Sequence, residues 1–367
     1  MNSLAFSNML HRPARTVVSV IGIGIGILLI VFTIGLANGS LRERAQRESN
    51  VGAEIMFRSQ GAVSLGGSDG LNLPVTMVRD IQMVEGVGAV IPVATVNAPA
   101  ADGLTGTRLV DGINYDDYAA MAGLKIVEGR KFVDGRDEMM SDQTWLDRRG
   151  AKIGDKLSIY DRDFEIVGAY DLSAGARVKI PLTTMQAQMG AEGKTSSFLV
   201  KVKDGYTPQA VGDNLFKRFP DNQIILTSEL EELYMQGIPA LNVFLNVVIG
   251  VAAAISALII LLTMYTTVTE RTRQIGVLKS LGMSKLGIAW TIVQEALLIS
   301  IGGTVFGVLV TIGLKYALAK WTTLAVSVDP KVVLTVIIVG IISGVIGALY
   351  PGLRAANLDP VEALNYE

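Results

Sequence analysis

Few residues in this sequence have the types and spacing that enzymatic chemistry requires. The chain contains no cysteine and a single histidine, His11, which is flanked by arginines and is expected to be solvated. Thiolate metal sites and cysteine nucleophiles are therefore excluded. Gly193-Lys194-Thr195 resembles the end of a phosphate-binding loop, but that motif requires a glycine where Gln188 stands. We expect no catalytic residue, no metal site and no cofactor in this chain.

Glycines recur within the apolar parts of the sequence. Gly22, Gly24 and Gly26 do not form a dinucleotide-binding motif, because Ile27 occupies the position of its third glycine. Small residues four apart instead allow membrane helices to approach closely. This spacing occurs as Gly22/Gly26, Gly303/Gly307 and Gly340/Gly344. The pairs indicate either packing among the helices of one chain or a dimer interface along the first apolar run.

Glu295 is the only acidic residue inside a long apolar run. A carboxylate in lipid costs about 2–3 kcal/mol or more unless it is shielded, so we expect this side chain to face protein or water. A proton relay would require a second intramembrane acid or a histidine. A structural hydrogen bond near the cytoplasmic interface is the favoured interpretation.

The segment from Glu270 to Lys285 combines apolar and basic residues at helical spacing. Ile275, Leu278 and Leu281 or Gly282 recur on one side, and Gly282 is placed to end the helix. Such a helix either lies on lipid headgroups or docks in the groove of a cytoplasmic partner. If it docks, the contacts are expected from Glu270, Arg271, Arg273, Gln274, Ile275, Gly276, Leu278, Lys279, Gly282 and Met283.

Four long apolar runs position these residues: 16–37, 241–268, 286–314 and 332–353. Hydrophobic residues make up 50% of the chain, which is too apolar for a soluble domain of 367 residues. Since about 20 apolar helical residues cross a bilayer, each run is predicted to be a transmembrane helix. Residues 38–240 are then a large water-exposed domain. The remaining segments are 1–15, 269–285, 315–331 and 354–367.

The flanks of these runs indicate the orientation of the chain. Lys and Arg are slightly more frequent on the side of both termini, which favours cytoplasmic termini. The first run is longer than the core of a typical signal peptide and is expected to remain as an anchor. Glu43/Arg47 and Arg44/Glu48 stand four apart, so the first helix is predicted to continue out of the bilayer as a stalk. The net charge of −2 offers no basic surface for nucleic acid, and membrane lipids are the expected surroundings.

Strand and helix patterns alternate within the large domain. Residues 54–59 and 89–97 have the pattern of strands around a helix at 74–84, and a second strand, helix and strand follow at 197–202, 208–219 and 223–227. Two such units predict a split βαβ layer. Short β runs between them predict an inserted β-rich subdomain over residues 107–181. The expected fold class is an α-helical membrane domain of four transmembrane helices plus an α+β extracytoplasmic domain.

The linker and the tail resemble a known family. The run from Glu270 to Ser284, followed by Glu295-Ala296, is similar to the signature of the MacB/FtsX/LolC-type ABC transporter permeases, and residues 350–364 resemble that family's ending. Within the large domain, motifs that resemble the MacB-type periplasmic core are Leu73-Pro74, Val84-Glu85-Gly86-Val87, Glu128-Gly129-Arg130 and Val167-Gly168. Gln274 departs from the pattern, in which an acidic residue is common, so a salt bridge to an ATPase is not implied there.

The resemblance implies a permease subunit of the bacterial cytoplasmic membrane, closest to MacB-type permeases whose ATPase is a separate chain. Two copies of a cytoplasmic ABC ATPase would bind ATP and Mg²⁺, and the permease would form a homodimer or a heterodimer with a related permease. Residues 270–283 would be the coupling helix in the ATPase groove. ATP binding would move the extracytoplasmic domain and export an amphiphilic substrate such as a peptide, lipid, lipoprotein or drug. A periplasmic adaptor protein is a further partner that the family allows.

Two other functions compete with export. One is a non-transporting, FtsX-like signalling or scaffold protein that regulates a cell-envelope enzyme, although the size of the extracytoplasmic domain favours export. The other is a membrane-anchored enzyme, which finds no support because the large domain has no histidine, no cysteine and no recognisable nucleophile motif.

Overall fold

The computed structural model describes residues 13–60, 70–99, 107–236, 239–322, 325–359 and 363. Two compact units are present, one formed by the chain up to Gly39 and from Pro239 onward, the other by Ser40–Ile238. We call them the membrane unit and the sheet unit. Most of the predicted N-terminal segment, including His11, and most of the tail beyond residue 359 lie outside the described residues.

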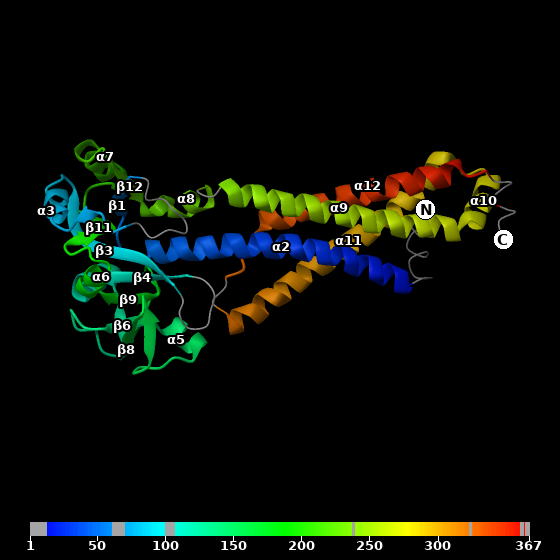
Figure 1. Ribbon diagram of the computed structural model, residues 1–367. Helices are drawn as coiled ribbons and strands as arrows, with labels where there is room; N and C mark the ends of the chain where they lie inside the picture. Colours follow the sequence, from blue (N-terminus) through cyan, green and yellow to red (C-terminus); the bar gives the residue numbers. More distant parts are fainter. Residues whose placement is uncertain are drawn as a thin grey trace. The chain divides into compact units, whose positions relative to one another are not determined.

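The membrane unit is built from long helices (Figure 1): α2 (Pro13–Ser49), α9 (Pro239–Glu270), α11 (Lys285–Trp321) and α12 (Pro330–Asn357). Each contains a stretch long and apolar enough to cross a membrane, so within the described residues the prediction of four long apolar helices is confirmed. The helices extend past the predicted runs. Because α11 continues to Trp321, the connection predicted from residue 315 begins only at residue 322.

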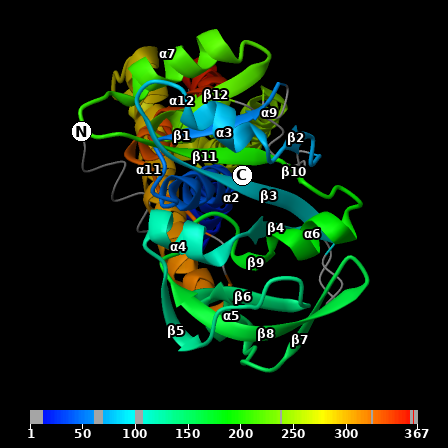
Figure 2. The same ribbon diagram turned by 90° about the vertical axis from the view of Figure 1, so that its left-hand side faces the viewer.

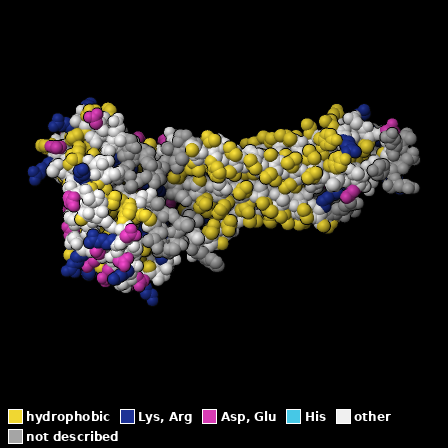
Figure 3. Space-filling model, in the orientation of Figure 1, with side chains coloured by type: hydrophobic (Ala, Val, Ile, Leu, Met, Phe, Trp, Pro, Cys, Tyr) yellow, Lys and Arg dark blue, Asp and Glu magenta, His cyan; other side chains and the backbone are white. Residues whose placement is uncertain are grey.

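The helices of the membrane unit pack around one apolar core. Helix α12 packs along both α9 and α11, which make few contacts with each other. The shared core contains fully buried side chains of α2, among them Ile23, Ile27 and Ile30. Apolar side chains also cover the outside of the unit (Figure 3), as expected of helices that face lipid.

The last turns of α2 belong to the sheet unit and carry the predicted stalk pairs. Glu43 and Arg47 lie 3.3 Å apart, and Arg44 and Glu48 lie 3.2 Å apart. The helix continues to Ser49, well beyond the apolar run. The predicted extension of the first helix is therefore confirmed.

The sheet unit contains the predicted split βαβ layer. Its strands are β1 (Ile55–Ser59), β3 (Val87–Pro99), β11 (Ser197–Val202) and β12 (Asn222–Leu226), in the order β12-β1-β11-β3 with antiparallel neighbours. Helices α3 (Met77–Gln82) and α7 (Pro208–Arg218) cover the face that carries Ile55 and Phe57 (Figure 2). Side chains alternate along a strand, so Met56 enters the core on the other face.

The inserted subdomain extends the same sheet. The thirteen residues of β3 pair first with β11 and then with β4 (Thr107–Ile113), and the order continues β4-β9-β6-β8-β5. The other strands are β5 (Lys125–Gly129), β6 (Glu138–Asp142), β7 (Lys156–Ile159), β8 (Arg162–Asp171) and β9 (Val178–Pro181). The prediction of β-rich structure is confirmed but incomplete, because the insert also contains α4 (Tyr115–Ala122) and α5 (Gln143–Arg149).

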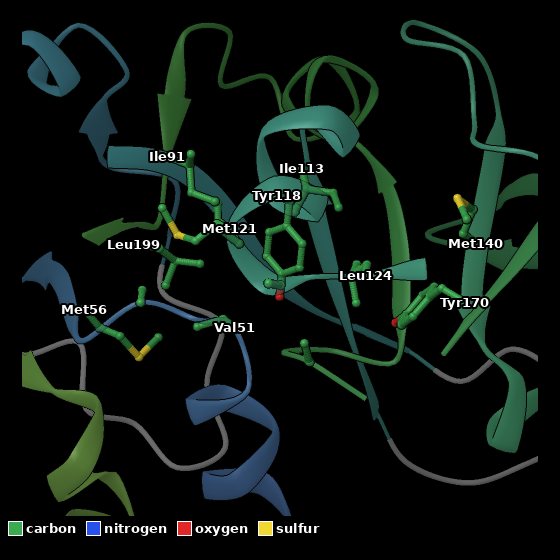
Figure 4. Close-up of a cluster of buried hydrophobic side chains, with 14 of the residues drawn as sticks. Val51, Met56, Ile91, Ile113, Tyr118, Met121, Leu124, Met140, Tyr170 and Leu199 are labelled. Carbon is green, nitrogen blue, oxygen red and sulfur yellow. The ribbon is translucent and has the colours of Figure 1, made fainter. Parts of the chain in front are cut away.

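One hydrophobic core joins the βαβ layer and the insert. Figure 4 shows Met56, Ile91 and Leu199 of the βαβ layer near Ile113 and Tyr118 of the insert. All of these side chains are at most 8% exposed. Since burial of one such side chain contributes about 1.5–3 kcal/mol, the shared core stabilises both layers together.

Further short elements belong to the sheet unit. They are α6 (Leu182–Gln188), which follows β9, the 3-10 helix η1 (Thr227–Glu229) and α8 (Leu230–Gln236), which follow β12, and a two-stranded ribbon of β2 (Leu73–Pro74) and β10 (Lys194–Thr195). Lys194 and Thr195 are thus paired in a strand. No helix follows them directly, unlike the residues of a phosphate-binding loop.

Candidate docking helix and the charged contacts around it

The linker between α9 and α11 forms a short helix, α10 (Thr272–Ser280). Gly282 adopts a φ of +93°, and the Gly282 amide donates to the Lys279 carbonyl, which closes the helix as predicted. Ser284 then accepts a hydrogen bond from the Gly287 amide at 3.1 Å and begins α11. The direction of α10 is therefore fixed at its end by backbone geometry.

Three charged side chains attach this linker to other helices of the membrane unit. Glu270 accepts a 2.9 Å bond from Arg15 of α2, and Arg271 lies 3.6 Å from Glu295 of α11. Lys279 donates to the carbonyl of Leu358, directly after α12. The two ends of the linker helix are thus connected to α2, α11 and the residue after α12.

Glu295 has the shielded position expected from its cost in lipid. Its side chain is 7% exposed and its Arg271 partner 13%. The structure pairs it with a cation rather than with a second acid, and the described residues contain no cluster of three or more acidic or histidine side chains that could hold a metal ion. An ion pair that holds the linker explains this residue without proton transfer.

The two sides of α10 differ sharply. Thr272, Ile275 and Gly276 are buried, whereas Arg273 and Gln274 are exposed. Three apolar residues also face outward: Val277 is 42% exposed, Leu278 37% and Leu281 79%. The predicted apolar side is therefore divided, with Ile275 packed inward and Leu278 and Leu281 turned outward. We call the outward residues Val277, Leu278 and Leu281 the apolar patch of α10.

The predicted packing glycines all lie against another helix of the same chain. A Cβ added at Gly22 or Gly26 would meet Ile259 or Ser256 of α9, and one at Gly303 or Gly307 would meet Ile23 or Ile27 of α2. Gly340 and Gly344 of α12 approach Thr304 and Ser300 of α11. Close approach within one chain accounts for these positions.

The sheet unit holds a second group of charged residues, which the sequence reasoning missed. Arg177 binds Glu43 of the stalk and lies 3.2 Å from Asp142, the residue that caps α5. Arg47 donates to the Gly175 carbonyl at 2.9 Å, and the Gly175 amide donates back to the Arg47 carbonyl at 2.7 Å. The end of α2 is thereby tied to the insert by contacts to the loop before β9.

Lys179 is buried beneath this loop. Its ammonium donates to the carbonyls of Ala174 and Ala176 at 2.8 and 3.0 Å and lies 3.3 Å from Asp111. Burial lowers the pKa of Lys179, while the neighbouring Asp111 opposes that shift. The only sequence signal was a lysine in the apolar strand Val178–Pro181.

Helices that can span a membrane, a large mixed sheet unit and a basic linker helix together define a multi-pass membrane protein with one large domain between its first two spans. Two family models cover this architecture. Residues 16–216 match the MacB-like periplasmic core domain, and residues 246–360 match the FtsX-like permease C-terminal model. The chain belongs to the MacB/FtsX-type family of ABC transporter permeases.

Curated relatives agree with the family models. The chain is 26% identical to the uncharacterized ABC transporter permease YknZ of Bacillus subtilis, over 99% of this chain and 98% of that one. It is 25% identical to the macrolide export ATP-binding/permease protein MacB of Acinetobacter baylyi, over 99% of this chain but 59% of the relative. It is thus similar to little more than half of the MacB protein.

A solved structure matches more weakly. The periplasmic region of MacB from Actinobacillus actinomycetemcomitans aligns with 54% of this chain and 98% of its own length, at 15% identity and a TM-score of 0.38. The family assignment depends on the family models, which span most of the chain.

Proposed function

We propose that this chain is the membrane subunit of an ABC exporter and that α10 docks on a separate cytoplasmic ATPase. The ATPase binds ATP and Mg²⁺, and its movement is passed through α10 to the spans. The sheet unit, outside the cytoplasm, moves in response and exports an amphiphilic substrate. In this arrangement both termini of the chain are cytoplasmic.

The observation that carries the proposal is the apolar patch of α10. A leucine that is 79% exposed gains about 1.5–3 kcal/mol when a partner buries it fully. The patch lies on a helix whose ends are attached to neighbouring helices by Glu270, Arg271 and Lys279. An exposed apolar surface on a firmly attached helix suits a contact that must transmit force.

The relatives support the division of labour between two chains. YknZ, which is named a permease, matches almost from end to end, whereas the name of the MacB relative joins ATP-binding and permease functions and only 59% of that protein is matched. A pyoverdine export ATP-binding/permease protein of Pseudomonas savastanoi pv. phaseolicola is 24% identical over 96% of this chain. Since the macrolide and pyoverdine exporters are similarly distant, the relatives favour export without selecting one amphiphile.

The sheet unit is suited to move as one body. Its layers share one sheet and one core, and the stalk end of α2 is bound to the insert through Glu43, Arg47 and Arg177. Movement of the stalk would therefore carry the insert with it. Substrate would be met in this unit, where a periplasmic adaptor protein is a further candidate partner.

The docking proposal is tested by Leu281→Asp, measured as ATP hydrolysis by the purified complex of this chain with its ATPase. Leu281 is preferable to Gly276 because Gly276 is buried, so a large residue there would disturb α10 itself. We expect Leu281→Asp to abolish substrate-stimulated hydrolysis and to weaken copurification of the ATPase.

Met83→Asp is the matched control, since Met83 is an equally apolar residue, 74% exposed, that belongs to the sheet unit and not to α10. It should leave hydrolysis unchanged. Normal stimulated hydrolysis in Leu281→Asp would disprove docking through the patch. If hydrolysis depends on Leu281 but no amphiphile is moved and a cell-envelope enzyme is activated instead, the signalling alternative replaces export.

A further inference from the structure

A cavity of about 370 Å³ opens beside α10 in the membrane unit. It is enclosed by the end of α9, one side of α10 and the first turns of α11, with Val268, Ile275, Leu278, Ile288 and Ile292 among its walls. Its volume falls in the range of small-molecule sites, about 300–1,000 Å³. We propose that this cavity binds one acyl chain of an anionic phospholipid, with the headgroup near Arg271 and Lys285.

The walls of the cavity favour an apolar occupant. Val268, Ile288 and Ile292 are each at most 7% exposed. The hydroxyls of Thr267 and Thr291 donate to carbonyls of their own helices, at 2.7 and 2.9 Å. The lining also includes Gln274 and the ion pair of Arg271 with Glu295. The rest of the wall is mostly aliphatic, so a hydrocarbon chain fits against it while the two charges stay paired.

The cavity lies where headgroups are expected if α9 and α11 cross a bilayer. It is formed at the ends of both helices, and the side chain of Trp290, between the lining residues Ile288 and Thr291, is 53% exposed. Tryptophan gathers at membrane–water interfaces because its ring is apolar and its N–H is polar. Leu286, one turn nearer the start of α11, is 82% exposed. An acyl chain could therefore enter from the surrounding lipid.

The charge around the cavity selects the headgroup. Residues 271–285 include Arg271, Arg273, Lys279 and Lys285 and contain no acidic residue. Glu295 in the cavity wall pairs with Arg271, so the linker contributes more cations than the wall contributes carboxylates. Arg271 lines the cavity, and Lys285 precedes Ile288 by three positions, on the same face of α11. Basic pockets at the ends of membrane helices attract anionic lipids. A phosphate at the opening, with its chain inside, matches both the charge and the apolar walls.

A bound lipid would fill the space between α10 and the spans to which it is attached. This inference goes beyond the proposed function, because the occupant comes from the bilayer. Val277 and Leu278 of the apolar patch also line the cavity, so a bound lipid would share them with a docked ATPase and leave Leu281 to the ATPase alone. If both proposals hold, the lipid supports the helix that receives the force of the ATPase.

Because the chain contains no cysteine, the labelling of a single introduced cysteine can test this proposal. The full-length single-cysteine variant Ile292→Cys is placed in nanodiscs of phosphatidylcholine, or of phosphatidylcholine mixed with phosphatidylglycerol, and its labelling by N-ethylmaleimide is timed. Phosphatidylglycerol should slow labelling about fivefold, since each Lys or Arg near an anionic surface contributes about 1 kcal/mol. Adding Lys285→Glu should remove most of this protection.

Ile301→Cys is the control, because Ile301 is 49% exposed on α11 and does not line the cavity. Its labelling should be the same in both lipid mixtures. Equal rates for Ile292→Cys in the two mixtures would overturn the proposal. So would protection that arises only when the ATPase is added, because the occupant would then be a segment of that partner.

Discussion

Glu138 shows how one carboxylate can hold a strand end in the sheet unit. Its side chain is 7% exposed and accepts two 2.8 Å bonds from Arg130 and one from the Val133 amide. The Arg130 hydrogen bonds lower the pKa of Glu138 to about 2, and the Val133 amide adds to the effect. The ionised form is therefore stabilised by folding.

We predict that Glu138→Gln lowers the free energy of unfolding by about 1.5–3 kcal/mol at neutral pH, the range for hydrogen bonds to charged groups. Because folding lowers this pKa, the contribution is complete above the unfolded value of 4.5 and is lost as the pH falls toward 2. The two proteins should converge over that window. Urea unfolding of the full chain in detergent, followed by tryptophan fluorescence, measures the difference.

Glu165→Gln is the matched control, because Glu165 pairs with Glu138 in the neighbouring strand but is exposed. It should change stability little at any pH. A constant gap between wild type and Glu138→Gln from neutral pH down to pH 2 would contradict the assignment of this pKa.

The sequence predicted where individual charged residues are shielded, but not which residues they contact. The cost of a carboxylate in lipid was enough to expect that Glu295 is shielded, and the structure supplies Arg271 as its neighbour. The partners of Lys179 could not be derived, because Asp111 stands 68 positions away. Such contacts depend on sheet order, which a single sequence does not determine.

At the scale of elements, α10 is a short helix held largely by contacts outside itself. A nine-residue helix is marginal alone, since isolated helices below about 12–15 residues are barely stable in water. Helical spacing and Gly282 predicted its existence and its end. The sequence did not predict that Ile275 turns inward and Leu278 outward. These directions depend on where the spans lie around α10.

We predict that Arg271→Gln loosens α10, because it removes the cation that pairs with Glu295 and leaves a buried carboxylate. Hydrogen exchange of the amides of residues 272–281 should become faster by about tenfold or more, given a loss of at least about 1.4 kcal/mol. Arg273→Gln, an exposed change on the same helix, should leave these rates unchanged. Equal exchange in both variants would show that Arg271 does not hold α10.

On the scale of the whole molecule, the length of one strand decides how the sheet unit is assembled. Periodicity placed the βαβ strands, and the split layer followed from their order. Periodicity did not show that the insert continues the same sheet. The continuous sheet depends on the length of β3, which extends to Pro99 and pairs first with β11 and then with β4. The order of the insert strands depends on long-range pairing in the same way.

A second copy of the permease would pack against an exposed face of its long helices. The packing glycines of α2 are occupied by contacts within the chain, so they do not identify a dimer surface. Another stripe of α2 is exposed: Val17, Ile21, Ile25 and Leu29, four residues apart and between 41% and 58% exposed. This spacing places the four side chains along one side of the helix. A second copy packed along this stripe would bury it.

We predict that the chain forms a homodimer through this stripe. Ile25→Cys should form a disulfide-linked dimer under mild oxidation in membranes, because a symmetric contact along α2 brings the two Cα atoms within the 4.4–6.8 Å that a disulfide spans. Ile346 on α12 is as apolar as Ile25 and is similarly exposed, at 60%. The control variant Ile346→Cys should therefore stay monomeric. The native chain has no cysteine, so any covalent dimer on a non-reducing gel reports the introduced residue. Equal cross-linking of both variants would indicate random collision, and none in Ile25→Cys would exclude a homodimer along this face of α2.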